Sequence, residues 1–316
     1  MRTKHINGKS INKEMVDITF KTFTLRKAIA GATIKTSSVS TIEAIKNGTV
    51  PKGNVLEFAR ASALLAIKKT SDVIPDCHPL PVEFATITYD FDEININVKV
   101  EVHTIYKTGV EVEAMHGASV ASLVIYDMLK PIDKNVEIAN IRLLEKKGGK
   151  SNQKSIDVTD LTAAVVVCSD SVSQGVKDDS SGKILVEVLE KQGFNTIDYS
   201  IVPDDILSIQ EKIESFKNKN CNLLIFTGGT GLSDRDVTPE AVLPFITKEI
   251  PGIMETARNY GQDRVKTSML SRGIAGFSDD MLILTLPGSA GAVKEYVQAL
   301  FPQILHVFSV KKGDEH

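Results

Sequence analysis

The sequence predicts two domains of different fold class: an α+β domain with an antiparallel sheet, then a three-layer α/β domain with a mostly parallel sheet. At 316 residues the chain is long enough for both. In the first half, apolar and polar residues alternate over 94–102, which is typical of a strand buried on one face. In the second half, apolar runs alternate with helical segments, as a parallel sheet covered on both faces requires.

The first half is expected to contain strands and helices that do not alternate strictly along the chain. Apolar residues at helical intervals predict a helix at 55–69. Pro131 ends a second predicted helix, which spans 112–130. Three prolines exclude a regular helix from 71–81. The mixture indicates an α+β domain of ferredoxin-like type. In order, we expect a strand at 15–18, a short helix or turn at 24–31, a helix at 55–69, strands at 84–89 and 94–102, a helix at 112–130 and a strand at 136–144.

The stretch KKGGKSNQKSIDVTD, residues 146–160, separates the halves. It is rich in Lys, Ser, Gly and Asn and has almost no apolar residues, which is typical of a flexible linker. We therefore expect a first domain over 1–152, a linker over 153–160 and a second domain over 161–316.

The second half is expected to alternate strands with helices, with Gly193 capping the first helix. The expected strands are 161–168, 196–202, 223–226 and 281–286, and the expected helices are 183–192, 206–217, 239–246, 251–260, 268–273 and 290–301. A polar loop follows each strand, and the carboxyl edge of an open α/β sheet is where ligands bind. These loops are Ser169-Asp170-Ser171, Pro203-Asp204-Asp205, Thr227–Asp236 and Pro287-Gly288-Ser289.

The stretch LLIFTGGTGLSDRDVTPE, Leu223–Glu240, runs from a strand through a glycine loop into a helix. Glycines let backbone N–H groups approach an anion closely, so the loop is a candidate phosphate cradle, although a plain tight turn is the simpler alternative. No P-loop lysine follows, which argues against a nucleotide-hydrolysing switch. Asp204 and Asp236 are candidate metal ligands; their alternative role is helix capping, for which Asp205 is better placed.

Composition limits the remaining function classes. A net charge of −3 gives no reason to expect nucleic-acid binding, and no apolar run reaches the roughly 20 residues of a membrane helix. The N-terminus lacks the apolar region of a signal peptide. Cys77, Cys168 and Cys221 form no CxxC pair, so neither a disulfide framework nor a zinc site is expected. These features favour a cytoplasmic protein without membrane or nucleic-acid partners.

Several polar residues of the first half could form a site for an anionic ligand. Asp127 and Lys130 share one helix face, although such a pair is often only a surface ion pair. His78 lies in a proline-bounded loop, where it could transfer protons or simply hold the loop. Glu111 and Glu113 point the same way and could bind a polar ring or face water. These residues alone do not define a reaction.

Three motifs of the first half resemble the cyclic pyranopterin monophosphate synthase family: SDVIPDCHPLP, KTGVEVEAMHGASVASLVIYDMLK and RLLEKKGGKS. The likeness covers nearly all of residues 1–152. It implies a lyase that converts (8S)-3',8-cyclo-7,8-dihydroguanosine 5'-triphosphate to cyclic pyranopterin monophosphate and diphosphate. It also implies dimers assembled into a hexamer, with sites shared between subunits.

The resemblance implies catalytic roles for Asp127, Lys130 and Lys52. It implies that the guanine-derived ring and phosphates contact Arg26, His78, Glu111, Glu113, Met115 and Lys146. The chain departs from the family at Lys52-Gly53-Asn54, where an Asp is expected after the glycine.

Four motifs of residues 160–310 resemble the molybdopterin adenylyltransferase family, whose fold is shared with the molybdopterin-binding domains of gephyrin-like proteins. The motifs are SDS, VPDD, TGGTGLSDRDVTPEA and LPGSAGAVKE. The family joins molybdopterin to the adenylyl group of Mg-ATP, which implies catalytic or metal-positioning roles for Asp204 and Asp236. Contacts to phosphate or pterin are implied for Thr227, Gly228, Gly229, Thr230, Gly231 and Ser289, with Ser169 and Asp170 at the rim.

Together the resemblances predict a bifunctional enzyme of molybdenum cofactor biosynthesis, a homo-oligomer that is hexameric or trimer-based. Its partners would be the cyclised dihydro-GTP substrate, molybdopterin and ATP, with Mg²⁺ entering with ATP and no covalently bound cofactor. The alternative is an active synthase whose second domain only binds pterin or scaffolds the assembly.

Overall fold

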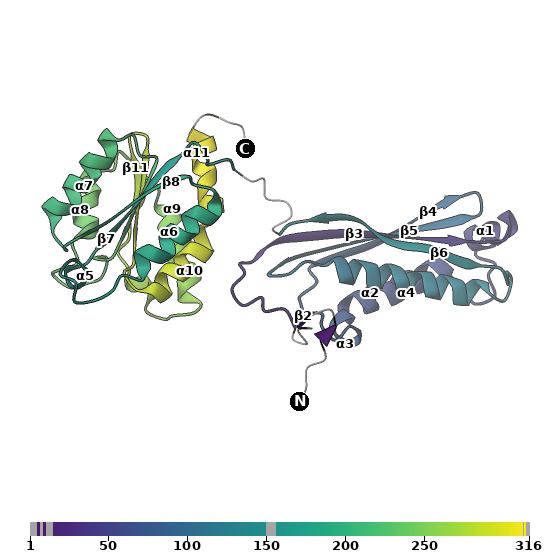
Figure 1. Ribbon diagram of the computed structural model, residues 1–316. Coiled ribbons are helices and arrows are strands. Elements are labelled where there is room, and N and C mark those ends of the chain that lie inside the picture. Colours follow the sequence, from purple (N-terminus) through teal and green to yellow (C-terminus); the bar gives the residue numbers. More distant parts are fainter. Residues whose placement is uncertain (1–4, 7–8, 11–14, 150–155, 312, 314–316) are drawn as a thin grey trace. The chain divides into compact units, whose positions relative to one another are not determined.

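The computed structural model describes residues 5–6, 9–10, 15–149, 156–311 and 313. The chain divides into two compact units, Met1–Gln153 and Lys154–His316. Each has its own sheet and its own core, and Figure 1 labels their elements.

The first unit contains a four-stranded antiparallel sheet in the order β4-β5-β3-β6. Helices α2 and α4 lie side by side on one face of this sheet (Figure 1). Every second residue of β5 from Ile96 to Val102 is buried in the core beneath them. The elements are β1 (His5–Ile6), β2 (Lys9–Ser10), β3 (Thr24–Lys35), α1 (Val39–Lys46), α2 (Val55–Lys68), α3 (Thr70–Val73), β4 (Phe84–Asp92), β5 (Asn95–Tyr106), α4 (Glu111–Leu129) and β6 (Glu137–Lys147). The predicted α+β class is confirmed.

Small side chains allow α4 to pack closely against α2 and the sheet. Ala114, Gly117, Ala118 and Ala121 of α4 are all buried. A Cβ atom added at Gly117 would lie 2.7 Å from Cγ1 of Ile67 on α2. This close packing fixes the position of α4, which carries candidate functional residues at both of its ends.

Two predictions for the first unit are wrong. Residues 15–18 form no strand, and Met15 and Val16 are exposed. The segment 24–31, expected as a helix or turn, is part of the 12-residue strand β3. The Ala and Ile residues of this segment suit either conformation; pairing with β5 on one side and β6 on the other makes it a central strand.

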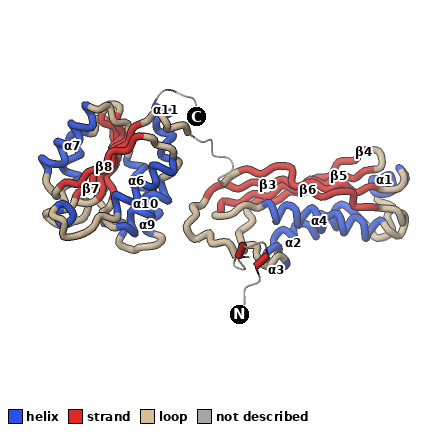
Figure 2. The backbone as a smooth tube through the Cα atoms, in the orientation of Figure 1, coloured by secondary structure: helices blue, strands red, loops and turns tan. Residues whose placement is uncertain are grey.

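The second unit contains a six-stranded sheet in the order β10-β11-β12-β9-β7-β8. Strands β12, β9, β7 and β8 are parallel, and β11 and β10 add an antiparallel edge. Figure 2 shows helices on both sides of the strands. The elements are β7 (Thr162–Cys168), α5 (Asp170–Ser173), α6 (Ser181–Gln192), β8 (Thr196–Val202), α7 (Ile206–Asn218), β9 (Leu223–Thr227), α8 (Thr238–Val242), η2 (Leu243–Phe245), β10 (Lys248–Glu249), α9 (Pro251–Gln262), η3 (Ser268–Leu270), β11 (Ala275–Ser278), β12 (Met281–Leu286), α10 (Ala290–Leu300), η4 (Gln303–Leu305) and α11 (His306–Lys311).

Two separate cores confirm the three-layer α/β class. Alternate residues of the central strands contribute to opposite faces: Val165 packs with α6, α9 and α10, whereas Val166 packs with α7 and α8. The predicted cap at Gly193 is confirmed, because this glycine ends α6 with a φ of 101°.

Some details of the second unit differ from expectation. The predicted helix at 268–273 is only the 3-10 turn η3, and the antiparallel strands β10 and β11 were not predicted. Of the expected linker 153–160, residues 153–155 lie outside the described residues. Val158 is 1% exposed and belongs to the core of the second unit. Among the described helices, none is long and apolar enough to cross a membrane.

Candidate functional sites

One candidate site of the first unit lies at the carboxyl end of α4. The Asp127 carboxylate accepts hydrogen bonds from Lys130 Nζ at 2.8 Å and from Lys52 Nζ at 2.7 Å. Lys52 Nζ also donates to the Asp127 carbonyl oxygen at 2.8 Å. The hydrogen bonds from Lys130 and Lys52 lower the pKa of Asp127 to about 2, and the same contact raises the pKa of Lys130. This lysine–carboxylate–lysine group therefore contains a carboxylate that stays ionised at neutral pH.

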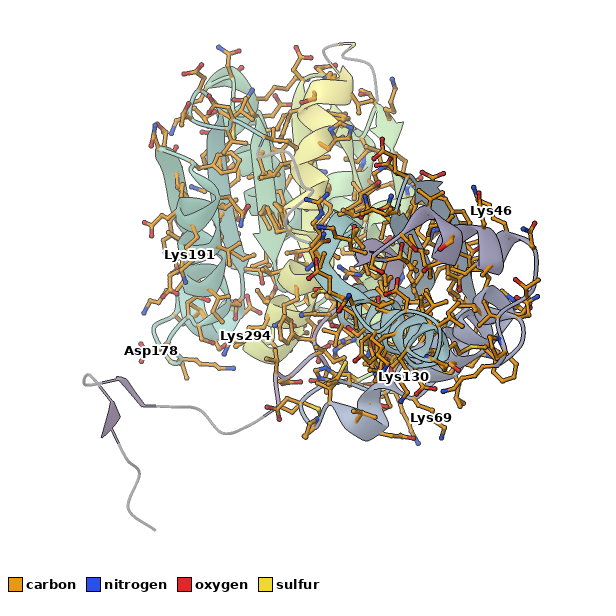
Figure 3. All side chains as sticks on the ribbon, turned by 90° about the vertical axis from the view of Figure 1, so that its right-hand side faces the viewer. Lys46, Lys69, Lys130, Asp178, Lys191 and Lys294 are labelled. Carbon is orange, nitrogen blue, oxygen red and sulfur yellow. The ribbon has the colours of Figure 1, made fainter. Side chains whose placement is uncertain are left out.

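The local sequence explains how this group forms. Asp127 and Lys130 are three residues apart, and Lys130 caps α4 (Figure 3). The turn that presents Lys52 contains Gly53, with a φ of 98° that favours glycine. Asn54, which replaces the expected Asp, caps α2 by accepting a hydrogen bond from Glu57 N at 3.1 Å. The group lines an open cavity of about 720 Å³ with Phe58, Ser62, Leu123, Val124, Tyr126 and Met128.

A second group of predicted residues gathers at the amino end of α4. Lys146 Nζ pairs with Glu111 Oε1 at 2.6 Å. Glu113 is 2% exposed and accepts a hydrogen bond from Cys77 Sγ at 3.3 Å. Burial raises the pKa of the Glu113 carboxyl, and burial beside Glu113 raises the pKa of the Cys77 thiol to about 12. Oε2 of both glutamates is buried without a hydrogen-bond partner among the described residues, so this group has acceptors to offer a ligand.

Arg26 and His78 are held by backbone oxygens in this region. Arg26 Nε donates to Tyr106 O at 3.3 Å, and His78 Nε2 lies 2.7 Å from Val16 O. Burial lowers the pKa of Arg26, and the negative charge of Glu111 opposes that shift. A Cβ atom added at Gly149 would lie 2.3 Å from a terminal nitrogen of Arg26, so this glycine leaves room for the guanidinium.

The two groups do not meet within one chain. Glu111 and Asp127 are sixteen residues apart on the same straight helix. At about 1.5 Å of rise per residue, this separation corresponds to roughly 24 Å. Met115, also predicted to contact substrate, lies one turn from Glu111 and is exposed. The structure thus divides the predicted residues of the first unit into two sites, one at each end of α4.

In the second unit, the four predicted polar loops line one pocket of about 590 Å³. Ser169, Asp204, Thr227–Gly231 and Pro287–Ser289 all contribute to its wall. Each loop follows the carboxyl end of a parallel strand, which explains why they converge. Asp170 is not part of the wall but contacts Asp204.

Asp204 contributes a half-buried carboxyl group to the wall of this pocket. Its Oδ2 accepts a hydrogen bond from Asp170 N at 3.1 Å, whereas its Oδ1 is buried without a partner among the described residues. Burial raises the pKa of Asp204, and the negative charges of Asp170 and Asp236 raise it further. A cation in the pocket would relieve both effects. Asp205, rather than Asp204, caps α7 by accepting from Ser208 N at 2.8 Å, as predicted.

The glycine loop is held in place by its neighbours and leaves its own amides free. Gly228 has a φ of 106°, and a Cβ atom there would lie 2.1 Å from the Cys168 carbonyl oxygen. Thr238 Oγ1 donates to Gly228 O at 2.9 Å. The N–H groups of Gly229, Thr230 and Gly231 donate to no described residue. Three free amides in the same pocket as the half-buried carboxylates of Asp204 and Asp236 suit a phosphate accompanied by a cation.

Arg272 stabilises this loop through hydrogen bonds, and the sequence did not predict this role. Its Nε donates to Gly231 O at 2.7 Å and its backbone N to Thr230 O at 3.0 Å. Its two terminal nitrogens donate to Asp236 O and to the Glu240 carboxylate. Arg272 lies 41 residues beyond Gly231, so no local pattern could reveal the contact. The Asp236 side chain accepts from Ser233 N at 2.9 Å within the loop and caps no helix.

Metal binding by protein groups alone is not supported. No group of three or more His, Cys, Asp or Glu side chains is placed to hold a metal ion in the described parts of the chain. Asp204 and Asp236 could hold a divalent cation only with further ligands, such as phosphate oxygens.

Comparison with known proteins identifies both units. Residues 15–149 match the MoaC family, and residues 164–306 match the family described as "Probable molybdopterin binding domain". A cyclic pyranopterin monophosphate synthase of Clostridium perfringens is 45% identical over 153 residues, which are 47% of this chain and 94% of the relative.

Two relatives span both units. A molybdenum cofactor biosynthesis bifunctional protein of Chlorobaculum tepidum is 37% identical over 302 residues, 96% of each chain. Another from Synechococcus elongatus is 33% identical over 315 residues, 96% of this chain and 98% of the relative. The chain therefore belongs to the family of bifunctional molybdenum cofactor biosynthesis proteins, with a MoaC-family unit followed by a molybdopterin-binding-type unit.

Proposed function

We propose that the first unit converts (8S)-3',8-cyclo-7,8-dihydroguanosine 5'-triphosphate to cyclic pyranopterin monophosphate and diphosphate. The observation that carries this proposal is Asp127 held ionised between Lys52 and Lys130 at the wall of an open cavity. Opening a purine-derived ring requires positioned proton donors and acceptors, and both lysines are charged donors. Their charges would also stabilise the negative charge that develops as diphosphate leaves.

We propose further that each synthase site combines the two groups from different copies of the chain. A separation of roughly 24 Å along α4 is too large for one substrate to touch both groups of a single chain. A two-fold contact pairs one surface with the same surface of a second copy in reversed orientation, so residue i of one copy meets residue j of the other. The amino end of one α4 could therefore meet the carboxyl end of another. Exposed apolar residues on α2 and α4, Phe58, Leu65 and Leu123 among them, are suited to such a contact.

The direct test is turnover of the cyclised substrate by the purified chain. We expect release of diphosphate and a product with the mass of cyclic pyranopterin monophosphate. Intact substrate after incubation at micromolar enzyme would refute the proposed synthase activity.

For the second unit, we propose adenylylation of molybdopterin with Mg-ATP. The supporting observation is the unpartnered Oδ1 of Asp204, which lies in the same pocket as Asp236 and the free amides of Gly229–Gly231. The amides would bind phosphate oxygens, and the two carboxylates would hold Mg²⁺ together with those oxygens. When bound, the metal would neutralise charge on the reacting phosphates. The chain's own contribution is to hold both substrates beside the carboxylates of Asp204 and Asp236.

A second candidate function is pterin binding without catalysis. The description of the matching family names only molybdopterin binding, which supports this alternative. Incubation with molybdopterin and Mg-ATP, followed by mass spectrometry, distinguishes the two. Adenylylated pterin that disappears in Asp236→Ala and persists in Asp234→Ala supports the enzyme, because Asp234 is an exposed carboxylate of the same loop. Bound but unmodified molybdopterin would establish a binding module.

A further inference from the structure

The wall of the glycine-loop pocket in the second unit contains one basic side chain among several acidic ones. Lys177 is the only Lys, Arg or His among the described residues of this wall. Its side chain is exposed, and its Nζ makes no hydrogen bond or ion pair with the part of the chain that the structure describes. The acidic residues of the wall are Asp178, Asp179, Asp204 and Asp236. Within the described wall, Lys177 therefore carries the only positive charge available to an anionic ligand.

Two arginines of the same region have other roles. The Arg272 guanidinium donates its hydrogen bonds to the glycine loop and to Glu240, as described above. Burial raises the pKa of Asp204, and the charge of Arg235 partly opposes that rise. Neither arginine is part of the wall in which the free amides lie.

The loop that carries Lys177, residues 174–180, is anchored on both sides of this lysine. The backbone N of Lys177 donates to Ser171 O at 3.1 Å. Beyond Lys177, the buried carboxylate of Asp179 accepts a hydrogen bond from the Tyr199 hydroxyl at 2.9 Å. These contacts fix the backbone position of Lys177, while its four-carbon side chain remains free to follow a ligand.

The exposure of Lys177 places it toward the opening of the pocket, whereas Asp204 is half-buried. In adenylyl transfer, a phosphate oxygen of the acceptor forms a bond to the α-phosphorus of ATP. The bond from that phosphorus to the oxygen bridging to the β-phosphate breaks, and diphosphate leaves with the electron pair. Negative charge therefore grows on the diphosphate, which departs through the opening. A lysine ammonium binds phosphate as a point charge and stabilises charge that develops on it.

We propose that Lys177 binds the β- and γ-phosphates of ATP and stabilises the diphosphate that leaves. The free amides of Gly229–Gly231 then remain for the reacting phosphate groups. This assignment rests on the adenylylation proposed above and deepens it, because it names the residue that recognises the polyphosphate part of the nucleotide.

The test measures adenylylation of molybdopterin by the full chain with Mg-ATP. Lys177→Gln should raise KM for ATP about tenfold, lower kcat several-fold and leave KM for molybdopterin unchanged. Lys177→Arg keeps the charge and should restore most of the activity. Higher ionic strength should raise KM for ATP more in the wild type than in Lys177→Gln, because salt screens an exposed charge.

A second substitution in the same loop separates the effect of charge from a disturbance of the loop. Asp178, labelled in Figure 3, is exposed and lines the same pocket. Asp178→Asn removes a negative charge and should lower KM for ATP about twofold, opposite in sign to Lys177→Gln. Lys183→Gln is the neutral control, since Lys183 is exposed on α6 outside the wall and should change nothing.

Titration of each protein with Mg-ATP in the absence of molybdopterin gives a reading that is independent of turnover. The first unit is identical in all variants, so any nucleotide it binds cancels in the comparison. Adenylylation with an unchanged KM for ATP in Lys177→Gln, or a rise in KM for molybdopterin alone, would overturn only the assignment of Lys177. Weaker Mg-ATP binding in Lys177→Gln without any adenylylated product would overturn only the enzymatic proposal.

Discussion

Two lysines keep the Asp127 carboxylate ionised, and an ionised carboxylate can act only as a proton acceptor. Because hydrogen bonds from Lys130 and Lys52 lower its pKa to about 2, it is an acceptor at neutral pH, while the lysines are the proton donors. Asp127→Asn removes the acceptor and should lower synthase turnover at least about 100-fold. Turnover of the wild type between pH 5 and pH 9, measured as diphosphate release, should show no loss through protonation of Asp127.

The matched control is Asp72→Asn. Asp72 forms an exposed ion pair with Lys69 at 3.0 Å, also three residues apart, but lies in no predicted site (Figure 3 labels Lys69). This variant should retain full turnover. Equal turnover in the two variants would show that the Asp127 group is only a surface ion pair.

Asp204 presents the opposite case, a carboxyl group whose folded-state pKa is raised. The folded protein then binds the proton more tightly than the unfolded chain, so the free energy of unfolding falls as pH rises from the unfolded to the folded pKa. Asp204→Asn should therefore raise the melting temperature of the second unit at pH 7 and have little effect below about pH 4. Calorimetry at both pH values measures this difference.

The same substitution should remove function. Mg-ATP is expected to raise the melting temperature of the wild type and to leave that of Asp204→Asn unchanged, because stabilisation follows binding to the folded state. A wild-type melting temperature that already exceeds that of Asp204→Asn at pH 7 without ligand would contradict the argument from burial.

At the scale of elements, Arg272 connects the segment after η3 to the glycine loop after β9. One guanidinium holds the carbonyl oxygens of Gly231 and Asp236 and the carboxylate of Glu240. A lysine keeps the charge but not the planar fork of donors, so it cannot hold all three acceptors. Arg272→Lys should lower kcat of adenylylation about tenfold through misplacement of Asp236, with a smaller effect on KM.

Two measurements distinguish misplacement of Asp236 from a general loss of stability in Arg272→Lys. Thermal unfolding of Arg272→Lys should show a folded protein at the assay temperature. Arg60→Lys is the control, because Arg60 forms an exposed pair with Glu57 on α2 of the other unit. If kcat is unchanged in Arg272→Lys, the loop does not depend on this arginine for its working geometry.

At the scale of the whole molecule, the length of α4 underlies our proposal that synthase sites form between copies of the chain. Asp127→Asn and Glu111→Gln each damage one end of α4. In a 1:1 mixture of the two variants, half of the dimers are mixed and each contains one intact site of two. Turnover should therefore recover to about a quarter of the wild-type value after subunit exchange.

A mixture of Asp127→Asn with Lys130→Ala is the control, because both changes lie at the same end of α4 and no intact site can form. Recovery in the first mixture and none in the second is the expected pattern. Equal inactivity of both mixtures would indicate that each site is built within a single chain.

The sequence by itself determined the features that depend on contiguous residues. Helix α2 follows from its apolar spacing, and the cap at Gly193 from a glycine at the end of a helical pattern. The candidate phosphate cradle also lies in one stretch, because its amides come from consecutive residues, Gly229–Gly231. For the same reason, local motifs were sufficient to identify both families.

Tertiary structure decided the features that depend on distant partners. Segment 24–31 is a strand because β5 and β6 pair with it, and neither neighbour is visible in its own residues. The separation of Glu111 from Asp127 follows from the straight course of α4. The loop contacts of Arg272 and the pocket that Lys177 shares with the glycine loop join residues far apart in the chain. Hydrogen bonds and packing act over a few ångströms in space whatever the sequence separation, so only the folded chain shows which side chains meet.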